Sequence, residues 1–371
     1  MKSVIKFWIL GVAGVFGVMI VGFLAWTTWK AFVQPRAAAA VACATESSCL
    51  YTVVNGSNNV RVMGFSPDGE RLLTDGANIV LHDGQTGEQV SRLNPDFDAS
   101  FRPVFMGERR EVAAVGREEI AFYDYEGALL RSWRADPGEP LTEFVSLPLV
   151  DGFALALEET IAIYRMSDGS QFTQFPDSAG MSQLTASADG AWLAAYHDDT
   201  QAVHVWPLAQ LDAAFSIREA GAVSRLQMSG DGSLLAWHTE QGAYVWRTTD
   251  AALLGRVEGP EVQVTALSLA ANGQRLAVGY DDSFVEIWSL HDEAIVDLFE
   301  HQSPLSEIAL SPDGERLAVG LRDSTSVTII TEEERRARQR RAERSGRGDH
   351  VGVGTFVETQ PGFAIVWDVN P

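Results

Sequence analysis

The chain has 371 residues, with 28 Lys and Arg against 50 Asp and Glu, so its formal net charge is -22. Such a charge repels phosphate groups and excludes a general nucleic-acid-binding surface. The two cysteines exclude a disulfide-rich scaffold and a four-cysteine zinc site, and the 46% hydrophobic content is that of a folded chain.

An uncharged apolar run follows a short N-terminal flank, residues 1–6, and extends over residues 7–29. About 20 residues suffice for a helix to cross the ~30 Å hydrocarbon core of a bilayer, and this run exceeds the usual apolar core of a cleaved signal peptide. We therefore predict an uncleaved transmembrane signal anchor, which makes the chain a single-pass protein of the inner (plasma) membrane. The small excess of positive charge before the run predicts a periplasmic location for the rest; a cytoplasmic-facing arrangement is the alternative.

Residues 30–49 form the predicted stalk between the anchor and the remaining domain. The two cysteines of the chain, Cys43 and Cys49, both lie in this stalk, six positions apart. In an exported stalk they are able to form a disulfide, because such bonds persist in oxidising compartments. Two free thiols are the alternative.

Residues 50–371 are periodic, and a turn sequence marks the period. Residues 66–72 and 311–317 share the sequence SPDGERL. Asp-Gly or Asn-Gly between alternating apolar runs is a strong hairpin signal, because glycine tolerates a positive φ. Related turns lie at Asp189-Gly190, Asp231-Gly232 and Asn272-Gly273, with degenerate copies at Arg109-Arg110 and Asp151-Gly152. The second residues of these seven turns are 38–42 positions apart along the chain.

A second mark has the same period, since an aromatic residue or histidine ends an apolar run in every unit. These residues are His82, Tyr123, Tyr164, Trp206, Trp246, Trp288 and Trp367. A period of about 40–45 residues with several short strands is typical of propeller blades. We predict an all-β, seven-bladed β-propeller over residues 50–371, preceded by the single transmembrane helix. The last unit lacks an outer strand, so residues 50–54 are expected to supply it and close the ring.

Several of these features resemble those of WD40 repeats. The strands that resemble the WD40 strand motif are Val205-Trp206, Val245-Trp246, Ile287-Trp288 and Val366-Trp367-Asp368. The Ser-Pro-Asp-Gly turns are similar to those of bacterial WD40-like and TolB-like propellers. The resemblance covers about residues 50–371, and it implies a WD40-like fold that serves as a non-enzymatic platform for protein interaction.

Acidic residues recur between the second and third predicted strands of the units. They are Asp75, Glu118, Glu119, Glu158, Glu159, Asp198, Asp199, Glu240, Asp281, Asp282 and Asp323. A propeller would gather these loops on one face, where an acidic ring draws a basic partner or binds cations. The alternative is that the acids serve the turns themselves. We take Asp198, Asp199, Asp281 and Asp282 as candidate partner-binding residues.

A charged insertion at about residues 324–360 interrupts the last unit. Residues 332–348 hold seven arginines and four glutamates, with Glu–Arg spacings of three and four that favour a helix without an apolar face. The arginines, which are also candidate partner-binding residues, are Arg335, Arg336, Arg338, Arg340, Arg341, Arg344 and Arg347. Three interpretations stay open: a solvated loop that docks on the protein's own acidic face, a docking arm for an acidic partner protein, and a contact with anionic lipid.

The sequence contains no motif of a catalytic, phosphate-binding or dinucleotide-binding site. His197, Asp198, Asp199 and His204 carry metal-ligating groups, but their spacing fits no metal motif and a surface loop is the expected structure. We therefore predict no enzymatic activity, no cofactor and no metal site.

The function predicted from these features is that of a membrane-anchored scaffold or accessory subunit. Its expected partner is another protein, in particular a subunit of a membrane complex, and no nucleic acid. The alternative is a sensor module that binds a small ligand or a cation. A hydrolase or lyase that uses loop carboxylates is a third and less favoured hypothesis.

Overall fold

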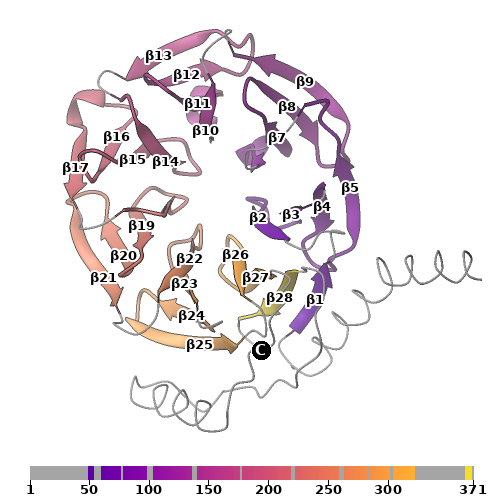
Figure 1. Cartoon of the computed structure of the whole chain (residues 1–371), viewed down its shortest axis with the longest axis vertical. Coiled ribbons are helices and arrows are strands. Elements are labelled where there is room, and N and C mark those ends of the chain that lie inside the picture. The colour runs from indigo at the N-terminus through magenta and orange to yellow at the C-terminus, as the bar shows by residue number, and fades with distance from the viewer. Residues whose placement is uncertain are drawn as a thin grey trace, which may run out of the picture.

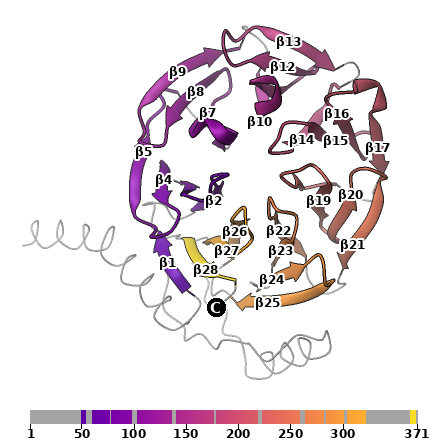
Figure 2. The same cartoon turned by 180° about the vertical axis from the view of Figure 1, so that it is seen from behind.

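The computed structural model describes residues 49–53, 60–76, 78–97, 103–135, 140–175, 178–218, 222–258, 263–281, 284–300, 304–321 and 364–369. The predicted anchor, most of the predicted stalk and the charged insertion lie outside these residues. Within them, the strands form seven antiparallel four-stranded sheets arranged as a ring, as seen from one side in Figure 1 and from behind in Figure 2. The predicted all-β, seven-bladed propeller is confirmed. No helix of the described residues is long and apolar enough to cross a membrane.

The first six blades each consist of four consecutive strands. Blade 1 contains β2 (Arg61–Phe65), β3 (Arg71–Asp75), β4 (Ile79–Asp83) and β5 (Gln89–Leu93). Blade 2 contains β6 (Val104–Phe105), β7 (Glu111–Val115), β8 (Glu119–Asp124) and β9 (Leu129–Arg134). Blade 3 contains β10 (Leu141–Leu147), β11 (Gly152–Leu157), β12 (Ile161–Arg165) and β13 (Gln171–Phe175). Short 3-10 helices, η2 (Gly107–Arg109) and η3 (Pro148–Val150), form the first turns of blades 2 and 3.

The next three blades repeat this arrangement. Blade 4 contains β14 (Met181–Ala186), β15 (Trp192–His197), β16 (Ala202–Pro207) and β17 (Phe215–Arg218), with the 3-10 helix η4 (Leu211–Ala213) before its last strand. Blade 5 contains β18 (Arg225–Met228), β19 (Leu234–Thr239), β20 (Gly242–Arg247) and β21 (Ala252–Glu258). Blade 6 contains β22 (Val264–Leu269), β23 (Arg275–Tyr280), β24 (Phe284–Ser289) and β25 (Ala294–Glu300).

Blade 7 is built from both ends of the described chain. Its strands β26 (Leu305–Leu310), β27 (Arg316–Leu321) and β28 (Ala364–Asp368) pair in sequence, and β1 (Cys49–Val53) pairs with β28 as the outer strand. The predicted closure of the ring by the residues that precede the first unit is therefore confirmed. Closing the ring in this way covers the edge of β28, which would otherwise be unpaired on the outside of blade 7.

The strand order gives the propeller two different faces. We call one the hairpin face, because it carries the turns that join first to second strands, such as residues 66–70, and third to fourth strands, such as 84–88. The other carries the turns that join second to third strands, such as residues 158–160, and the links between blades, such as 94–97. We call it the link face. Hydrogen bonds join the two parts of the link face, for example from the Ala135 N–H to the Glu118 carbonyl at 2.8 Å.

The seven predicted hairpins all contain a residue in the left-handed region. Five are the glycines Gly69, Gly190, Gly232, Gly273 and Gly314, with φ near +70°. The degenerate copies use Arg110, with φ of +55°, and Asp151, with φ of +47°. In blade 3 the turn residue is thus Asp151, one position before the predicted Gly152, which begins β11. Aspartate tolerates this conformation better than most residues because its short side chain bonds locally.

The hydrophobic core is divided into seven clusters, each lying between two neighbouring blades. One cluster, for example, joins Phe122 of β8 to Phe144 and Phe153 of blade 3, and the last joins Val53 of β1 to Val62 of β2. The aromatic residue or histidine predicted for each unit lies on the third strand in every blade. Successive side chains of a strand point to opposite faces of the sheet, so alternate residues pack against the preceding and the following blade. Both faces of every blade are therefore buried in the ring.

The hairpins also pack against one another around the ring. The residue two positions after one turn glycine lies beside the next turn glycine: a Cβ built on Gly232 would be 2.2 Å from the Trp192 ring, and one on Gly314 would be 3.2 Å from the Arg275 side chain. Backbone hydrogen bonds continue this contact sideways, from Gly230 N–H to the Ala271 carbonyl at 2.7 Å. At the junction of blades 7 and 1, the buried Arg316 guanidinium donates to the Gly69 and Gly84 carbonyls.

Candidate functional site

Exposed carboxylates gather on the link face, as the sequence predicts. The turns between second and third strands place them there, because each such turn is short and follows a fully buried strand. The exposed acids of these turns are Glu118, Glu158, Glu159, Asp198, Asp199, Glu240 and Asp281. They come from blades 2 to 6, which are five successive blades of the ring in Figure 1.

Most link-face carboxylates of these turns have no partner among the described residues. The side chains of Glu118, Glu158, Glu159, Asp198, Asp199 and Glu240 make no hydrogen bond or ion pair with another described residue. Asp281 is the exception, because its carboxylate accepts a hydrogen bond from the Gln263 N–H at 3.2 Å. A ligand would meet these free carboxylates without breaking bonds within the protein.

Several carboxylates on the hairpin face hold the turns together. The Ser311 hydroxyl donates to Asp313 at 2.5 Å and accepts from the Arg316 N–H at 2.9 Å, and the Glu315 N–H also donates to Asp313 at 3.0 Å. Burial by itself would raise the pKa of Asp313, but these hydrogen bonds and Arg316 outweigh it and hold the pKa below its ordinary value. The same Ser–Asp pair recurs at Ser66, Ser187 and Ser229. These acids are structural.

Ion pairs between blades engage further acids of the hairpin face. Arg110 of blade 2 donates to Asp68 at 2.9 Å and to Glu70 at 2.7 Å, both in the hairpin of blade 1. Arg109 reaches Asp151 in the hairpin of blade 3 at 2.9 Å. Acidic residues are thus common on both faces, and exposed carboxylates without partners among the described residues also occur on the hairpin face, at Glu88, Glu293 and Glu315. The link face differs in that its second-to-third turns carry such carboxylates in four successive blades, 2 to 5.

One member of the predicted acidic ring does not belong to it. Asp75 is buried and forms an ion pair with Arg61 across the first two strands of blade 1. The two residues face each other in the register of β2 and β3, beyond an irregularity between Val62 and Gly64 that adds one residue to β2. Counting outward from the hairpin without this irregularity places Val62 opposite Asp75, so the sequence contained no signal for the pair. Asp282 and Asp323 lie outside the described residues.

The Arg-rich insertion is attached to the link face. It connects Leu321, the last residue of β27, to Ala364, the first residue of β28, and both ends lie beside the first residues of the blade's inner strand. Its candidate residues, Arg335, Arg336, Arg338, Arg340, Arg341, Arg344 and Arg347, lie outside the described residues. The unpaired carboxylates and the arginine-rich segment therefore share one face of the molecule.

Two other predictions concern the cysteines and a pair of histidines. Cys43 lies outside the described residues, and only the backbone of Cys49 is described, so their disulfide stays a prediction. His197 and His204 are diagonal neighbours on β15 and β16, with ring centroids 6.2 Å apart, and burial lowers the pKa of His204. Among the described residues, no three His, Cys, Asp or Glu side chains are grouped to hold a metal ion.

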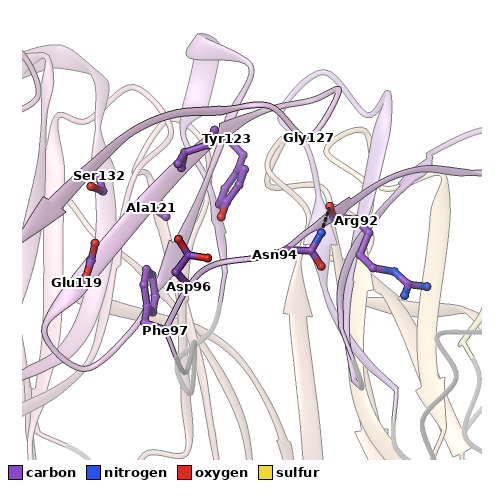
Figure 3. A pocket seen from close by; sticks show the side chains of 10 residues that line it. Arg92, Asn94, Asp96, Phe97, Glu119, Ala121, Tyr123, Gly127 and Ser132 are labelled. Atoms are coloured by element: carbon purple, nitrogen blue, oxygen red, sulfur yellow. Dashed lines mark hydrogen bonds between the residues drawn. The ribbon is translucent and has the colours of Figure 1, made fainter.

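A groove between blades 1 and 2 was not foreseen from the sequence. It has a volume of about 370 Å³ and lies between the end of β5 with its following link and the strands β8 and β9 (Figure 3). Its lining includes Asp96 and Phe97 from the link and Tyr123 from β8. The sequence marked Tyr123 only as a periodic aromatic, since nothing in the chain order shows that the link of one blade crosses the third strand of the next.

The fold and its surfaces define a protein of the propeller class with a distinct charged face. Residues 252–289 match the model of the family described as WD domain, G-beta repeat, and this match extends from β21 through β24. The match and the seven blades together support a WD40-like propeller, a fold that commonly serves as a protein-interaction scaffold. No curated protein matches the chain.

Proposed function

We propose that this protein is a membrane-tethered interaction platform whose link face binds a basic segment of a partner protein. The observation that carries the proposal is the set of exposed carboxylates on that face without partners among the described residues. In a chain with a net charge of -22, they produce a negative field that attracts positive segments and speeds their encounter. The WD40-like fold adds support, because propellers of this kind generally bind other proteins.

The proposed tether is the apolar run of residues 7–29, with the propeller on the periplasmic side of the inner membrane. The chain enters the propeller at Cys49, which pairs with Trp367 next to the hairpin end of blade 7. The preceding segment therefore joins the hairpin face, opposite the link face. This attachment supports an arrangement in which the unpaired carboxylates remain accessible to a partner while the chain is anchored.

We assign the Arg-rich segment of residues 332–348 the role of a second docking element, directed at acidic parts of the same partner complex. Its attachment to the link face, opposite the face that the tether joins, favours a protein partner over the lipid to which the chain is anchored. The Arg-rich segment and the unpaired carboxylates together place positive and negative charges on the same face. A partner with both a basic and an acidic segment would match such a surface in only one orientation.

The experiment that tests the link face compares two sets of charge removals in the tagged full-length chain. The link-face variant combines Asp198→Asn, Asp199→Asn and Glu240→Gln, and the control combines Glu88→Gln, Glu293→Gln and Glu315→Gln on the hairpin face. After extraction in a mild detergent, native mass spectrometry identifies companions and their stoichiometry. We expect the link-face variant to recover at least tenfold less partner than the control. Equal recovery from both variants, or a wild-type chain that elutes alone, contradicts the proposal.

A separate variant tests the Arg-rich segment. Deletion of residues 332–348 removes seven arginines from between β27 and β28 while leaving every described strand intact. We expect the deleted chain to keep the melting temperature of the wild type and to lose the companion protein. Unchanged recovery of the companion would remove the segment from the docking surface, without bearing on the link-face carboxylates.

A further inference from the structure

The groove between blades 1 and 2 opens beside the link face and contains two groups without partners. Tyr123 is 4% exposed, and its hydroxyl makes no hydrogen bond with a described residue. Asp96, an exposed residue of the link after β5, likewise has no hydrogen bond or ion pair among the described residues. Figure 3 shows the Tyr123 hydroxyl and the Asp96 carboxylate turned toward one another, and burial together with the Asp96 charge raises the pKa of Tyr123.

The surroundings of these two groups are suited to a cation. The Phe97 ring lies on one side of the Asp96 carboxylate, and the Tyr123 ring lies on the other (Figure 3). A guanidinium or ammonium group gains from a carboxylate and from the faces of aromatic rings, and the gain grows in a partly desolvated site. Glu119, farther along the groove, adds a second carboxylate.

Among the described residues, the two arginines nearest the groove are not bound to Asp96. Arg134 binds Glu119 at 2.7 Å through the oxygen Oε2, and its own side chain is largely exposed on β9. Arg92 also lines the groove, but Figure 3 shows its guanidinium pointing away from Asp96, beyond the Asn94 side chain. Asn94 itself donates to the Arg92 carbonyl at 3.4 Å.

Two apolar side chains also line the groove beside Tyr123. Ala121 lies two residues before Tyr123 on β8, and Leu129 of β9, 60% exposed, is paired with Tyr123 in the register of the two strands. Long basic side chains place their methylene stems along such surfaces while the charged end meets polar partners. The groove therefore offers a place for both parts of an arginine side chain.

We propose that this inter-blade groove receives an arginine side chain from the basic segment of the partner protein, with the guanidinium between Asp96, Phe97 and Tyr123. The inference rests on the proposed function for the nature of the partner, and it adds the anchor residue by which that partner is positioned. The link-face carboxylates attract the basic segment over a distance, and the groove fixes one of its side chains in place.

The test uses full-length protein in detergent and a synthetic peptide, so it does not depend on recovering the partner. The probe is a capped heptapeptide with one arginine among glycine and serine residues, compared with the same peptide carrying the neutral isostere citrulline. Saturation-transfer difference NMR detects weak binding and shows which peptide protons touch the protein. We expect saturation of the arginine methylene protons, and a Kd at least tenfold weaker for the citrulline peptide.

Variants of the protein locate the binding. Asp96→Asn is expected to weaken the arginine peptide at least tenfold and Phe97→Leu severalfold, while Glu88→Gln, an equal loss of charge on the hairpin face of blade 1, leaves the Kd unchanged. Melting temperatures confirm that each variant is folded. Equal Kd values for Asp96→Asn and Glu88→Gln, equal binding of the citrulline peptide, or no binding at all overturns the groove proposal. The link-face triple variant tests the proposed function separately.

Discussion

At the scale of single residues, His82 differs from its equivalents in the other six blades. It lies at the third-strand position that is tyrosine or tryptophan elsewhere, and it is 2% exposed. Its Nε2 lies 3.0 Å from the Thr74 hydroxyl and its Nδ1 lies 3.3 Å from the Gly87 carbonyl. Both nitrogens are satisfied when Nδ1 carries the proton and Nε2 accepts from Thr74. The histidine is thus held neutral within blade 1.

This burial makes His82 a source of acid sensitivity. Burial lowers the pKa of His82 to about 4, against an opposing effect of the Gly87 carbonyl. The unfolded chain takes up a proton below the ordinary pKa of 6.5 while the folded chain does not, so stability is lost as the pH falls from about 6.5 to 4. This difference between the unfolded and folded pKa corresponds to about 3 kcal/mol in the free energy of unfolding.

We expect the variant His82→Phe to lose much less stability than the wild type between pH 7 and pH 4. The free energy of unfolding in urea, measured at intervals across this range, provides the comparison. His291→Phe, on an exposed turn of blade 6, serves as the control and should retain the wild-type slope. A slope that His82→Phe leaves unchanged would show that His82 already titrates normally in the folded chain.

Two turn glycines separate the effect of backbone strain from that of packing. Gly180 and Gly232 both have φ of +70°, but a Cβ on Gly180 would meet no atom within 4 Å, whereas one on Gly232 would lie 2.2 Å from the Trp192 ring. Gly180→Ala should therefore cost about 1 kcal/mol, the penalty of a left-handed residue. Gly232→Ala should cost about 2 kcal/mol more, because the contact between blades 4 and 5 must shift.

The measurement is urea unfolding of both alanine variants and of Gly232→Ala combined with Trp192→Ala. If the clash causes the additional loss, the second substitution removes part of it and the two free-energy changes are not additive. Equal destabilisation at the two glycines would show that the hairpins of blades 4 and 5 accommodate the added Cβ without a loss of stability.

At the scale of elements, β1 is the strand that makes the ring continuous. Val53, 2% exposed, packs in the cluster between blades 7 and 1 together with Val366 of β28 and Val62 of β2. We expect Val53→Asp to destabilise the protein by about 3 kcal/mol or more, since it places an unpaired carboxylate in this cluster. Leu50→Asp, on the same strand but 46% exposed, should change the free energy of unfolding by less than about 0.5 kcal/mol.

Urea unfolding monitored by tryptophan fluorescence compares these two variants. Trp367 lies opposite β1 in blade 7, so its emission reports on the closure as well as on global unfolding. Equal stability of Val53→Asp and Leu50→Asp would mean that β1 contributes little to holding the ring closed.

The elements were predictable where a local signal determines them. Gly69 and Gly314 mark their hairpins because only few residues adopt a positive φ, and the period of the aromatic residues marks the third strands. The turn residue Asp151 was misplaced by one position, because Gly152 offered the stronger local signal although it begins β11. Surfaces made by two blades were not predictable, since Asp96 and Tyr123 meet only when the blades pack.

For the candidate site, the position of the acidic turns was predictable, but the pairing of their carboxylates was not. The turns that contain Asp198 and Asp199 follow from the repeat, and a ring of blades places all such turns on one face. Whether a carboxylate stays free depends on what its neighbours across the sheet offer. Asp75 has Arg61 opposite it, whereas Asp198 has no partner among the described residues. Whether a carboxylate has a partner is decided by contacts across strands and blades, and the sequence of a single turn does not reveal these contacts.

At the scale of the whole molecule, the negative charge destabilises the folded state but strengthens the binding of a basic segment. With a net charge of -22, the acidic side chains repel one another in the compact state. Salt screens that repulsion, with a Debye length of about 10 Å at 0.1 M. The attraction of the link face for a basic segment is screened by the same ions. Salt should therefore stabilise the propeller while it weakens the complex.

Salt also weakens the ion pairs between blades, but this opposes the stabilisation of the propeller by salt only weakly. Arg110 and its partners Asp68 and Glu70 are partly exposed, and pairs of this kind contribute about 0–1 kcal/mol each. We therefore expect the urea midpoint to rise between 0.05 M and 0.5 M NaCl, and to rise less in the variant that lacks Asp198, Asp199 and Glu240, whose repulsion is already reduced. A midpoint that falls with salt would mean that the hairpin-face ion pairs outweigh the repulsion among the unpaired carboxylates, and the link face would then be too weakly charged to guide a partner.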